Sequence, residues 1–386
     1  MKKVLIMGEI DLSLESDGVT QKTMSQAAAF EAMGAAVDCI GYEGAEIALR
    51  SFSQGKYKTN DCLGTVYNQK LKRFPIWIAI RKYLINHKYD VAYIRYPIID
   101  FVVFHALKQI RKSCDKVIIE IPSYPLEIEK ANLKRKALYC IDSILHKKCV
   151  YLVDEIFYVG NKSLKIFGCD AIQIPNGIPE KIKELESTGY SFGNGIINLI
   201  CVSNMHPFHG YDRLLKGLAK YYSDGEKKQI VTVTMVGNGS CRADYEKIVT
   251  DNNITKYVRF TGTLKGEKLT EEYRKASLGI SSLGMYRERF EEASSLKTKE
   301  YLVRGLPFVY AVNEIGFDES FPYALKLENN SSPVSIDEIV AFANRIKQLE
   351  PQKVVSEMRD YAILHYSWES IMRSACASIL DSTEYE

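Results

Sequence analysis

The chain has 386 residues, 46 % hydrophobic and 26 % charged, which fits a soluble protein of two domains and excludes a disordered or fibrous class. No apolar run reaches the roughly 18–20 residues needed to cross a bilayer, and the short apolar run after Met1 predicts a first strand rather than a signal peptide. The formal net charge is only +3, but residues 55–150 carry 19 Lys/Arg against 8 Asp/Glu, a local charge of +11.

The first half of the chain alternates short apolar runs, typical of buried parallel strands, with amphipathic helical stretches. This alternation predicts a doubly wound, mostly parallel sheet. The expected strands are residues 4–8, 36–40, 91–94, 117–121, 156–159 and 171–174, and the expected helices are 20–33, 74–86, 99–113 and 133–152.

A second series of the same kind follows a turn at 175–177 and a polar linker at 180–195. Two similar α/β halves predict two domains, 1–180 and 195–365, which face each other across a cleft, and a C-terminal helix at 366–386 that packs back on the first domain. The expected strands are residues 196–202, 230–236, 258–263, 278–282, 308–312 and 324–327. The expected helices are 211–222, 244–252, 268–275, 297–304 and 336–349, with helical sequence from 354 to about 381.

Three loops of the second half follow parallel strands and are therefore expected at one edge of the sheet. The first spans residues 203–212 and contains Asn204 and His209. The second contains Gly237 and Gly239, a Gly-x-Gly pattern that on its own is more often structural than functional. The third leads into the stretch 287–307. Together the three loops predict a single ligand site.

The stretch 287–307 holds two carboxylates, Glu292 and Glu300, with seven residues between them. Ser294 or Ser295 is a candidate N-cap for a short helix that begins near Leu296 and ends at a Gly-Leu-Pro sequence. The amides and positive dipole end of such a helix suit a phosphate group. The two glutamates also fit a plain alternative, in which both are surface charges of a helix.

These residues resemble the nucleotide-sugar domain of GT-B retaining glycosyltransferases of the family-4 type. The resemblance rests on the paired glutamates, on 300–302 with 305–307, on the turn at 174–178 and on the glycine loop at 236–239. It implies two Rossmann-like domains, an acceptor-binding one at 1–180 and a nucleotide-sugar-binding one at 195–365. The donor would be a nucleoside diphosphate sugar, with no separate cofactor.

The resemblance also implies roles for single residues. Glu300 would bind the ribose hydroxyls and Glu292 would contact the donor sugar as the catalytic residue. Ser295 and Leu296 would belong to the donor site, and Gly18 would belong to a loop between the first strand and helix that faces the donor phosphates. Gly237 and Gly239 would line the same donor site.

The sequence departs from the family pattern at the diphosphate clamp, where Asn204 and His209 stand in place of an Arg and a Lys. Lys297 is the best replacement cation, because it falls in the first helical turn, and Arg213 and Arg287 are weaker candidates. The family's His after the fourth strand of the first domain is also missing from 121–127, so no catalytic base is identified.

A metal site is not expected. His206 and His209 lie three residues apart, but no Cys, His or Asp nearby completes a ligand set, and no Asp-x-Asp motif is present. The nine cysteines form no CxxC pair, which favours reduced thiols in a cytoplasmic protein.

The resemblance therefore implies a retaining, metal-independent hexosyltransferase that uses a UDP-sugar and a hydroxyl of a glycan or lipid-linked saccharide, in surface polysaccharide synthesis. Two alternatives remain: a sugar-nucleotide epimerase of the same architecture, and a non-catalytic partner of an active transferase. The epimerase would need acid and base groups at a sugar carbon. The non-catalytic partner is motivated by Asn204, His209 and the missing His.

The basic first half suggests a peripheral contact with the inner face of the cell membrane. Residues 70–82 place cations beside aromatic and aliphatic side chains, as in an interfacial helix. The alternative is an ordinary helix with its apolar face on the sheet and its lysines in water. Nucleic acid is not expected as a partner, because no recognition motif accompanies the charge.

Overall fold

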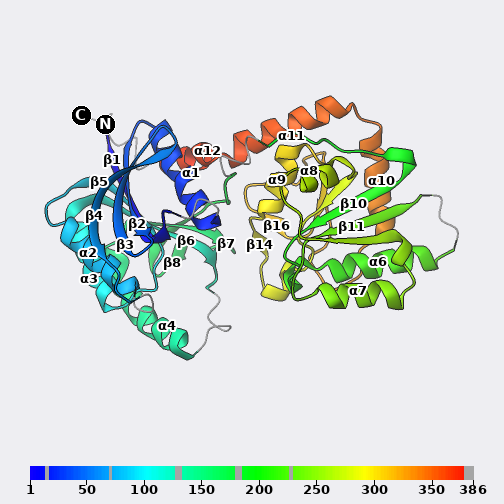
Figure 1. The fold of residues 1–386 in the computed structure, drawn as a ribbon. Coiled ribbons are helices and arrows are strands. Elements are labelled where there is room, and N and C mark those ends of the chain that lie inside the picture. Colours follow the sequence, from blue (N-terminus) through cyan, green and yellow to red (C-terminus); the bar gives the residue numbers. More distant parts are fainter. Residues whose placement is uncertain (14–16, 69–71, 127–132, 179–184, 226–228, 378–386) are drawn as a thin grey trace. The chain divides into compact units, whose positions relative to one another are not determined.

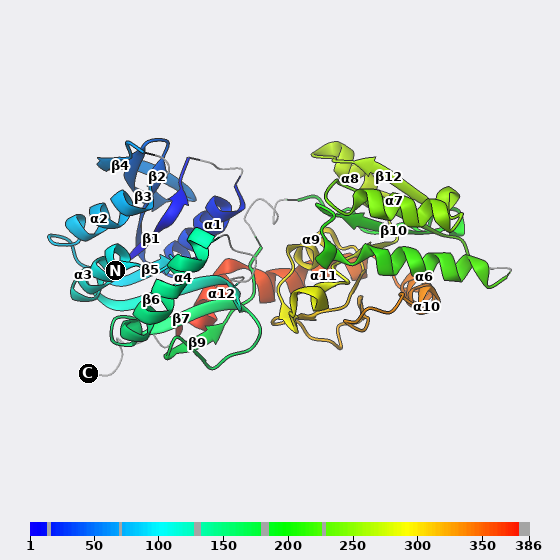
Figure 2. The same ribbon diagram turned by 90° about the horizontal axis from the view of Figure 1, so that it is seen from below.

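The structure is a computed structural model that describes residues 1–13, 17–68, 72–126, 133–178, 185–225 and 229–377. The chain divides into two compact units. Unit 1 comprises Met1–Glu180 with Ser367–Glu386, and unit 2 comprises Lys181–Tyr366. Figures 1 and 2 show that each unit is a sheet covered by helices.

The sheet of unit 1 has the strand order β4-β3-β2-β1-β5-β6-β7-β9-β8 in the described residues. Its central strands are parallel, as the sequence predicts, and the order reverses between β1 and β5. The bounds are β1 (Lys3–Asp11), β2 (Ala36–Glu43), β3 (Glu46–Ser53), β4 (Lys56–Thr65), β5 (Tyr89–Arg95), β6 (Cys114–Tyr124), β7 (Glu155–Gly160), β8 (Lys165–Ile166) and β9 (Cys169–Gln173).

Besides the two-residue β8, the sequence prediction lacks two strands of this sheet, β3 and β4. They form an antiparallel extension beside β2. The turn between them is Gln54-Gly55, and both residues have positive φ, 54° and 74°. A two-residue turn of this kind matches the twist of a β-hairpin. The surrounding residues alternate too weakly in polarity to predict strands, but the turn itself was a usable signal.

Helices cover both faces of the sheet in unit 1. Helices α1 (Gly18–Ala32) and α12 (Trp368–Ala375) pack together, and so do α2 (Arg73–Tyr83) and α3 (Phe101–Ser113). The α2–α3 pair buries Ile76, Trp77 and Ile80 in a core that also contains Leu5 and Met7 of β1. The remaining helices are α4 (Leu133–Leu145) and the 3₁₀ helix η2 (His146–Tyr151), so the helix expected over 133–152 changes type at His146.

The turn at 175–177 is held against the C-terminal helix of unit 1. A Cβ atom at Gly177 would come within 2.6 Å of the Trp368 ring, so glycine is required for this close approach. Lys22 donates to the side chain of Asn176 at 3.2 Å and lies 5.1 Å from the centre of the Trp368 ring. The same lysine forms an ion pair with Glu120, which is fully buried in β6.

The sheet of unit 2 has the order β12-β11-β10-β13-β15-β17, with all neighbours parallel. The order reverses between β10 and β13. Its strands are β10 (Ile197–Val202), β11 (Val231–Val236), β12 (Val258–Gly262), β13 (Leu278–Ile280), β15 (Phe308–Tyr310) and β17 (Ala324–Lys326), and β14 (Glu292–Ala293) pairs separately with β16 (Asn313–Glu314). Its helices are α6 (Tyr211–Ser223), α7 (Arg242–Asp251), α8 (Glu267–Arg274), α9 (Leu296–Arg304), α10 (Ile336–Lys347) and α11 (Pro351–Tyr366), with 3₁₀ helices η3 (Gly193–Gly195), η4 (Pro207–His209), η5 (Thr255–Tyr257) and η6 (Met285–Glu288).

The helical sequence expected from 354 to about 381, whose last part the sequence assigns to a C-terminal helix at 366–386, forms α11 and α12. It is divided at Ser367, which has extended backbone angles and caps α12 by accepting a hydrogen bond from the amide of Ser370 at 3.1 Å. The chain passes from unit 2 to unit 1 at this residue. The part of the prediction beyond residue 377 lies outside the described residues, as do residues 180–184 of the expected linker.

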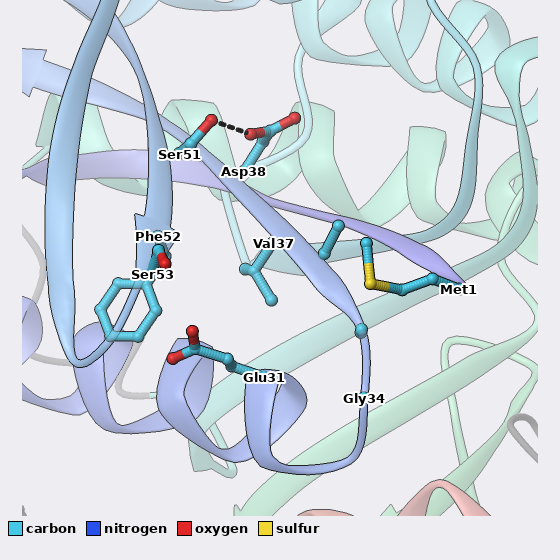
Figure 3. A pocket seen from close by; sticks show the side chains of 10 residues that line it. Met1, Glu31, Gly34, Val37, Asp38, Ser51, Phe52 and Ser53 are labelled. Carbon is cyan, nitrogen blue, oxygen red and sulfur yellow. Dashed lines mark hydrogen bonds between the residues drawn. The ribbon is translucent and has the colours of Figure 1, made fainter.

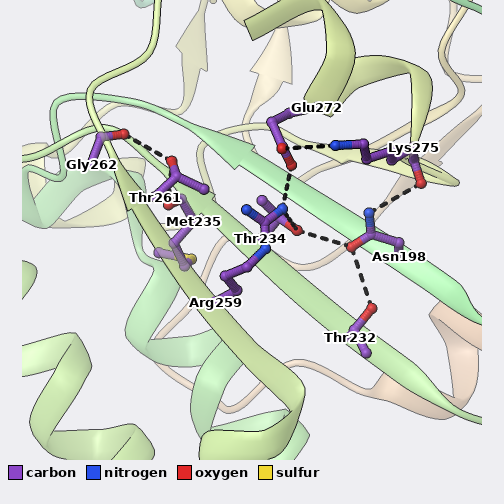
Figure 4. A network of polar contacts seen from close by, with 9 residues as sticks. All are labelled: Asn198, Thr232, Thr234, Met235, Arg259, Thr261, Gly262, Glu272 and Lys275. Atoms are coloured by element: carbon purple, nitrogen blue, oxygen red, sulfur yellow. Dashed lines mark hydrogen bonds and ion pairs between the residues drawn. The ribbon is translucent and has the colours of Figure 1, made fainter. Parts of the chain in front are cut away.

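Two further features lie at the amino-terminal edges of the sheets. In unit 1, a cavity of about 340 Å³ is lined by Glu31, Asp38 and Phe52 among others (Figure 3). In unit 2, a polar network joins Asn198 of β10 to β11, β12 and α8 (Figure 4). Neither contains a residue that the sequence places in the ligand site, and ligands of doubly wound sheets bind at the opposite edge.

Candidate functional site

The loops that follow β10 and β13 interlock at the carboxyl edge of the sheet in unit 2. Leu283 donates its backbone N–H to the carbonyl of His209 at 2.8 Å, and Gly284 donates to the carbonyl of Phe208 at 3.2 Å. Gly210 has a φ of +64°, and a Cβ atom there would lie 2.4 Å from the nitrogen of Gly284. These loops flank the reversal of strand order, which is where ligands of such sheets bind.

The glycine loop after β11 packs against the loop after β10. Gly237 has a φ of +120°, and a Cβ atom there would lie 1.9 Å from the carbonyl oxygen of Ser203. At Gly239 a Cβ atom would lie 1.8 Å from the carbonyl oxygen of Asn204. Both glycines are therefore required by the close approach of two loops of the protein itself.

Helix α9 begins as the sequence predicts. Of the two serines considered, Ser295 is the N-cap: its backbone is extended and its Oγ accepts a hydrogen bond from the amide of Lys297 at 3.3 Å. Gly305 ends the helix with a φ of +67°. The Oγ atoms of Ser281 and Ser295 lie 3.4 Å apart, so the start of α9 lies beside the loop that follows β13.

A buried ion pair anchors the start of α9, and the sequence prediction missed it. Glu314 of β16 accepts hydrogen bonds from the amide of Ser295 at 3.1 and 3.2 Å. Lys299 donates to the same carboxylate at 2.6 Å, and both side chains are buried. The Lys299 ammonium also lies 4.4 Å from the centre of the Tyr366 ring. No local sequence motif identifies Glu314 as a partner of α9. The two are brought together by the tertiary structure, in which β14 pairs with β16.

Lys297 is the second residue of α9. Burial lowers its pKa from 10.5 to about 8, although the nearby carboxylates of Glu300 and Glu314 oppose the shift. Burial also lowers the pKa of His209 to about 3, and the charge of Lys297 contributes to that lowering. Near neutral pH Lys297 is mainly protonated and His209 is uncharged.

The tautomer of His209 follows from its hydrogen bond. The amide of His206 donates to Nδ1 of His209 at 2.9 Å, so Nδ1 must accept. The neutral ring consequently carries its proton on Nε2 and offers one N–H donor. Asn204 is the other residue that stands where the similar glycosyltransferases carry a cation of the diphosphate clamp, and it is exposed. The loop after β10 thus supplies a neutral donor in place of a cation.

Glu300 lies in α9, one turn after Lys297. Its Oε1 atom accepts a hydrogen bond from Nε of Arg304 at 2.9 Å, and 23 % of its side chain is exposed. The guanidinium of Arg304 lies 4.1 Å from the centre of the Tyr273 ring. Glu300 is therefore oriented by its neighbours but reachable from solvent. Glu292 lies in β14 and is partly exposed.

The two weaker clamp candidates are engaged elsewhere. Arg213 is buried and donates to the carbonyls of Ser332 at 2.7 Å and Leu283 at 2.5 Å, which makes it a structural tie between loops. Arg287 forms a bidentate ion pair with Asp212, with N–O distances of 2.9 and 2.8 Å. Both guanidinium groups are thus occupied by the protein, and Lys297 remains the best-placed cation.

The sequence also predicts Gly18 and Leu296 as residues of the donor site. Gly18 belongs to unit 1 and is the first residue of α1, which Asp17 caps, and its role at the donor phosphates stays a prediction. A Cβ atom at Gly18 would meet no atom within 4 Å. Leu296 begins α9 with half of its surface exposed. Within the described ranges, no group of three or more His, Cys, Asp or Glu side chains is arranged to hold a metal ion.

No family model and no curated protein matches the sequence. Solved structures do match. The chain is similar to the Anabaena protein Alr3699/HepE in complex with UDP, with a TM-score of 0.61 and 14 % identity over 98 % of this chain and 99 % of that one. It is similar to the catalytic domain of starch synthase IV from Arabidopsis thaliana bound to ADP and acarbose, with a TM-score of 0.63 and 11 % identity over 99 % of each chain.

A third similar structure is sucrose-phosphate synthase from Thermosynechococcus elongatus, with a TM-score of 0.60 and 14 % identity over 99 % of this chain and 100 % of that one. The matches extend over nearly the whole length of each protein, although few residues are identical. They confirm the fold class that the sequence predicts. This chain has the two-domain GT-B fold of glycosyltransferases.

Proposed function

We propose that this protein is a glycosyltransferase that moves a hexose from a UDP-sugar to a hydroxyl group of a glycan or lipid-linked saccharide, with retention at the anomeric carbon. The observation that carries the proposal is the start of α9, where Lys297, the helix N-terminus and Glu300 lie together at the reversal of strand order. Fold neighbours in complex with UDP, UDP-glucose or ADP support a nucleotide sugar as the donor.

The donor would lie across the N-terminus of α9. A diphosphate diester carries two negative charges, and Lys297 with the half-charge of the helix dipole offsets about 1.5 of them. The Nε2–H group of His209 would add a neutral donor. Glu300, one turn further along, would accept hydrogen bonds from the ribose hydroxyls, while Arg304 holds the carboxylate in place. No metal and no separate cofactor is needed in this scheme.

The transfer would exchange one bond for another at the anomeric carbon. The acceptor oxygen forms a bond to that carbon on the face from which the diphosphate leaves, and the acceptor's proton passes to a phosphate oxygen. Lys297 and His209 would stabilise the negative charge that develops on the leaving group. Glu292 would contact the donor sugar and support positive charge at the reacting carbon. The product would serve surface polysaccharide synthesis in the cytoplasm.

The first experiment is calorimetry with a panel of nucleotide sugars, followed by the Glu300→Gln variant. Loss of a charged acceptor for the ribose hydroxyls should weaken UDP binding by about 10- to 100-fold. Glu271→Gln is the matched control, because Glu271 is an exposed helical glutamate of the same unit. Equal affinity in wild type and Glu300→Gln would refute the assignment of Glu300.

Two other outcomes would redirect the proposal. Isomerised sugar nucleotide after incubation with the donor alone would identify an epimerase instead. Failure to bind any nucleotide sugar in the panel would favour a non-catalytic partner of another transferase.

A further inference from the structure

Helices α2 and α3 of unit 1 pack side by side. Three large apolar side chains are exposed on them or beside them. They are Ile78 of α2, 44 % exposed, Ile85 just after α2, 60 % exposed, and Phe101 in the first turn of α3, 63 % exposed. We call these residues, with the cations described next, the α2–α3 surface.

Cations lie among these apolar residues. Arg81, Lys82, Lys108 and Lys112 are all exposed. The sequences of α2 and α3, RFPIWIAIRKY and FVVFHALKQIRKS, contain no Asp or Glu. In the parts of the chain that the structure describes, none of the four forms an ion pair. Arg111 differs from these four, because its Nη1 atom forms an ion pair with Oδ2 of Asp154 at 2.5 Å.

The apolar residues are not needed for the stability of these helices. The inward faces already bury Ile76, Trp77 and Ile80 of α2 and Val103, Leu107 and Ile110 of α3. Ile78 of α2 and Ile85 just after it are instead both exposed. Exposed isoleucines beside cations that form no ion pair fit a surface that is apolar within and negatively charged outside.

We propose that the α2–α3 surface docks the protein on a bilayer that contains anionic lipids, with Ile78, Ile85 and Phe101 entering the interface and the cations contacting the headgroups. Charge complementarity supports this partner, since each lysine or arginine near an anionic membrane strengthens binding about five-fold. None of the helices in the described part of the chain combines the length and apolar character needed to cross a bilayer. The proposal concerns peripheral binding and does not rest on the catalytic one.

The test is flotation of the full chain with phosphatidylcholine vesicles, with and without phosphatidylglycerol, at low and high salt. Binding should require phosphatidylglycerol and weaken at high salt. The variant Arg81→Gln, Lys82→Gln should bind roughly 30-fold more weakly. The variant Lys347→Gln, Lys353→Gln removes two exposed lysines of unit 2 and should bind like wild type.

The apolar contribution is tested separately. The variant Ile78→Ser, Ile85→Ser should bind roughly 100-fold more weakly. Serine in place of each isoleucine removes the free energy that an apolar side chain gains when it moves from water into the membrane interface. Ile363→Ser, at an equally exposed position of α11, is the control. Thermal unfolding of each variant verifies that it is folded, so that a loss of binding is attributable to the surface.

Three results would overturn the proposal. One is equal binding by wild type and both surface variants. Another is binding of a duplex DNA fragment at least as tight as binding of the anionic vesicles, which would identify a nucleic-acid surface. The third is a wild-type dimer in analytical ultracentrifugation that the Ile78→Ser, Ile85→Ser variant abolishes, which would identify a contact between two copies of this chain.

Discussion

Replacing Lys297 by methionine should make the ligand-free protein more stable and its binding of UDP weaker. Methionine preserves the unbranched shape of the side chain and removes the charge. Burial lowers the pKa of Lys297 from 10.5 to about 8, which corresponds to a cost of about 3 kcal/mol for the charged form. Allowing for the partial exposure of the side chain, the variant should gain about 1–3 kcal/mol of unfolding free energy at neutral pH.

The difference in unfolding free energy between Lys297→Met and wild type should shrink as the pH rises. Below the folded pKa of about 8 the lysine is charged in both the folded and unfolded states, so wild type carries the full cost. As the pH rises from 8 towards 10.5, the folded state releases its proton first, and the stability gap between variant and wild type should close. Urea denaturation at several pH values measures this gap.

The affinity of Lys297→Met for UDP should decrease, although its stability increases. Loss of a charge-assisted contact to the diphosphate should weaken UDP binding by about 10- to 100-fold in calorimetry. The affinity of wild type should fall as the pH rises above about 8, and that of Lys297→Met should not. Lys268→Met is the control, because Lys268 is also the second residue of a helix, but is exposed, and should change stability by about 0.5 kcal/mol or less. A less stable Lys297→Met with unchanged UDP affinity would refute the reasoning.

Two further changes test the surroundings of this lysine. Glu292→Gln should lower the rate of sugar transfer with little change in UDP affinity, which steady-state kinetics with calorimetry would separate; an unchanged rate would remove Glu292 from the reaction. Glu314→Gln should cost about 3–5 kcal/mol of stability in denaturant unfolding, because it leaves the ammonium of Lys299 buried without its counter-ion. The double variant Lys299→Met, Glu314→Gln should recover most of that loss, and failure to recover it would show that the carboxylate acts mainly through the amide of Ser295.

The fold could be predicted from the sequence because its buried elements have strong local signals. The central strands of both sheets are continuous apolar runs, and α9 is bounded by a serine cap and a glycine in the left-handed region. These signals act over a few residues, so they need no knowledge of the tertiary structure. Where the local signal was weak, as in the hairpin of β3 and β4, the prediction failed.

The chemistry of the site depended on contacts between distant parts of the chain. The sequence determined which residues follow the strands of unit 2, and hence that Lys297, Glu300 and His209 belong to one edge of a sheet. Only the tertiary structure decided that Lys297 is buried enough to have a lowered pKa, that His209 is neutral with its proton on Nε2, and that Arg213 is occupied by backbone carbonyls. Protonation and hydrogen bonding are set by burial and by neighbours far away in the chain, and local sequence does not specify either.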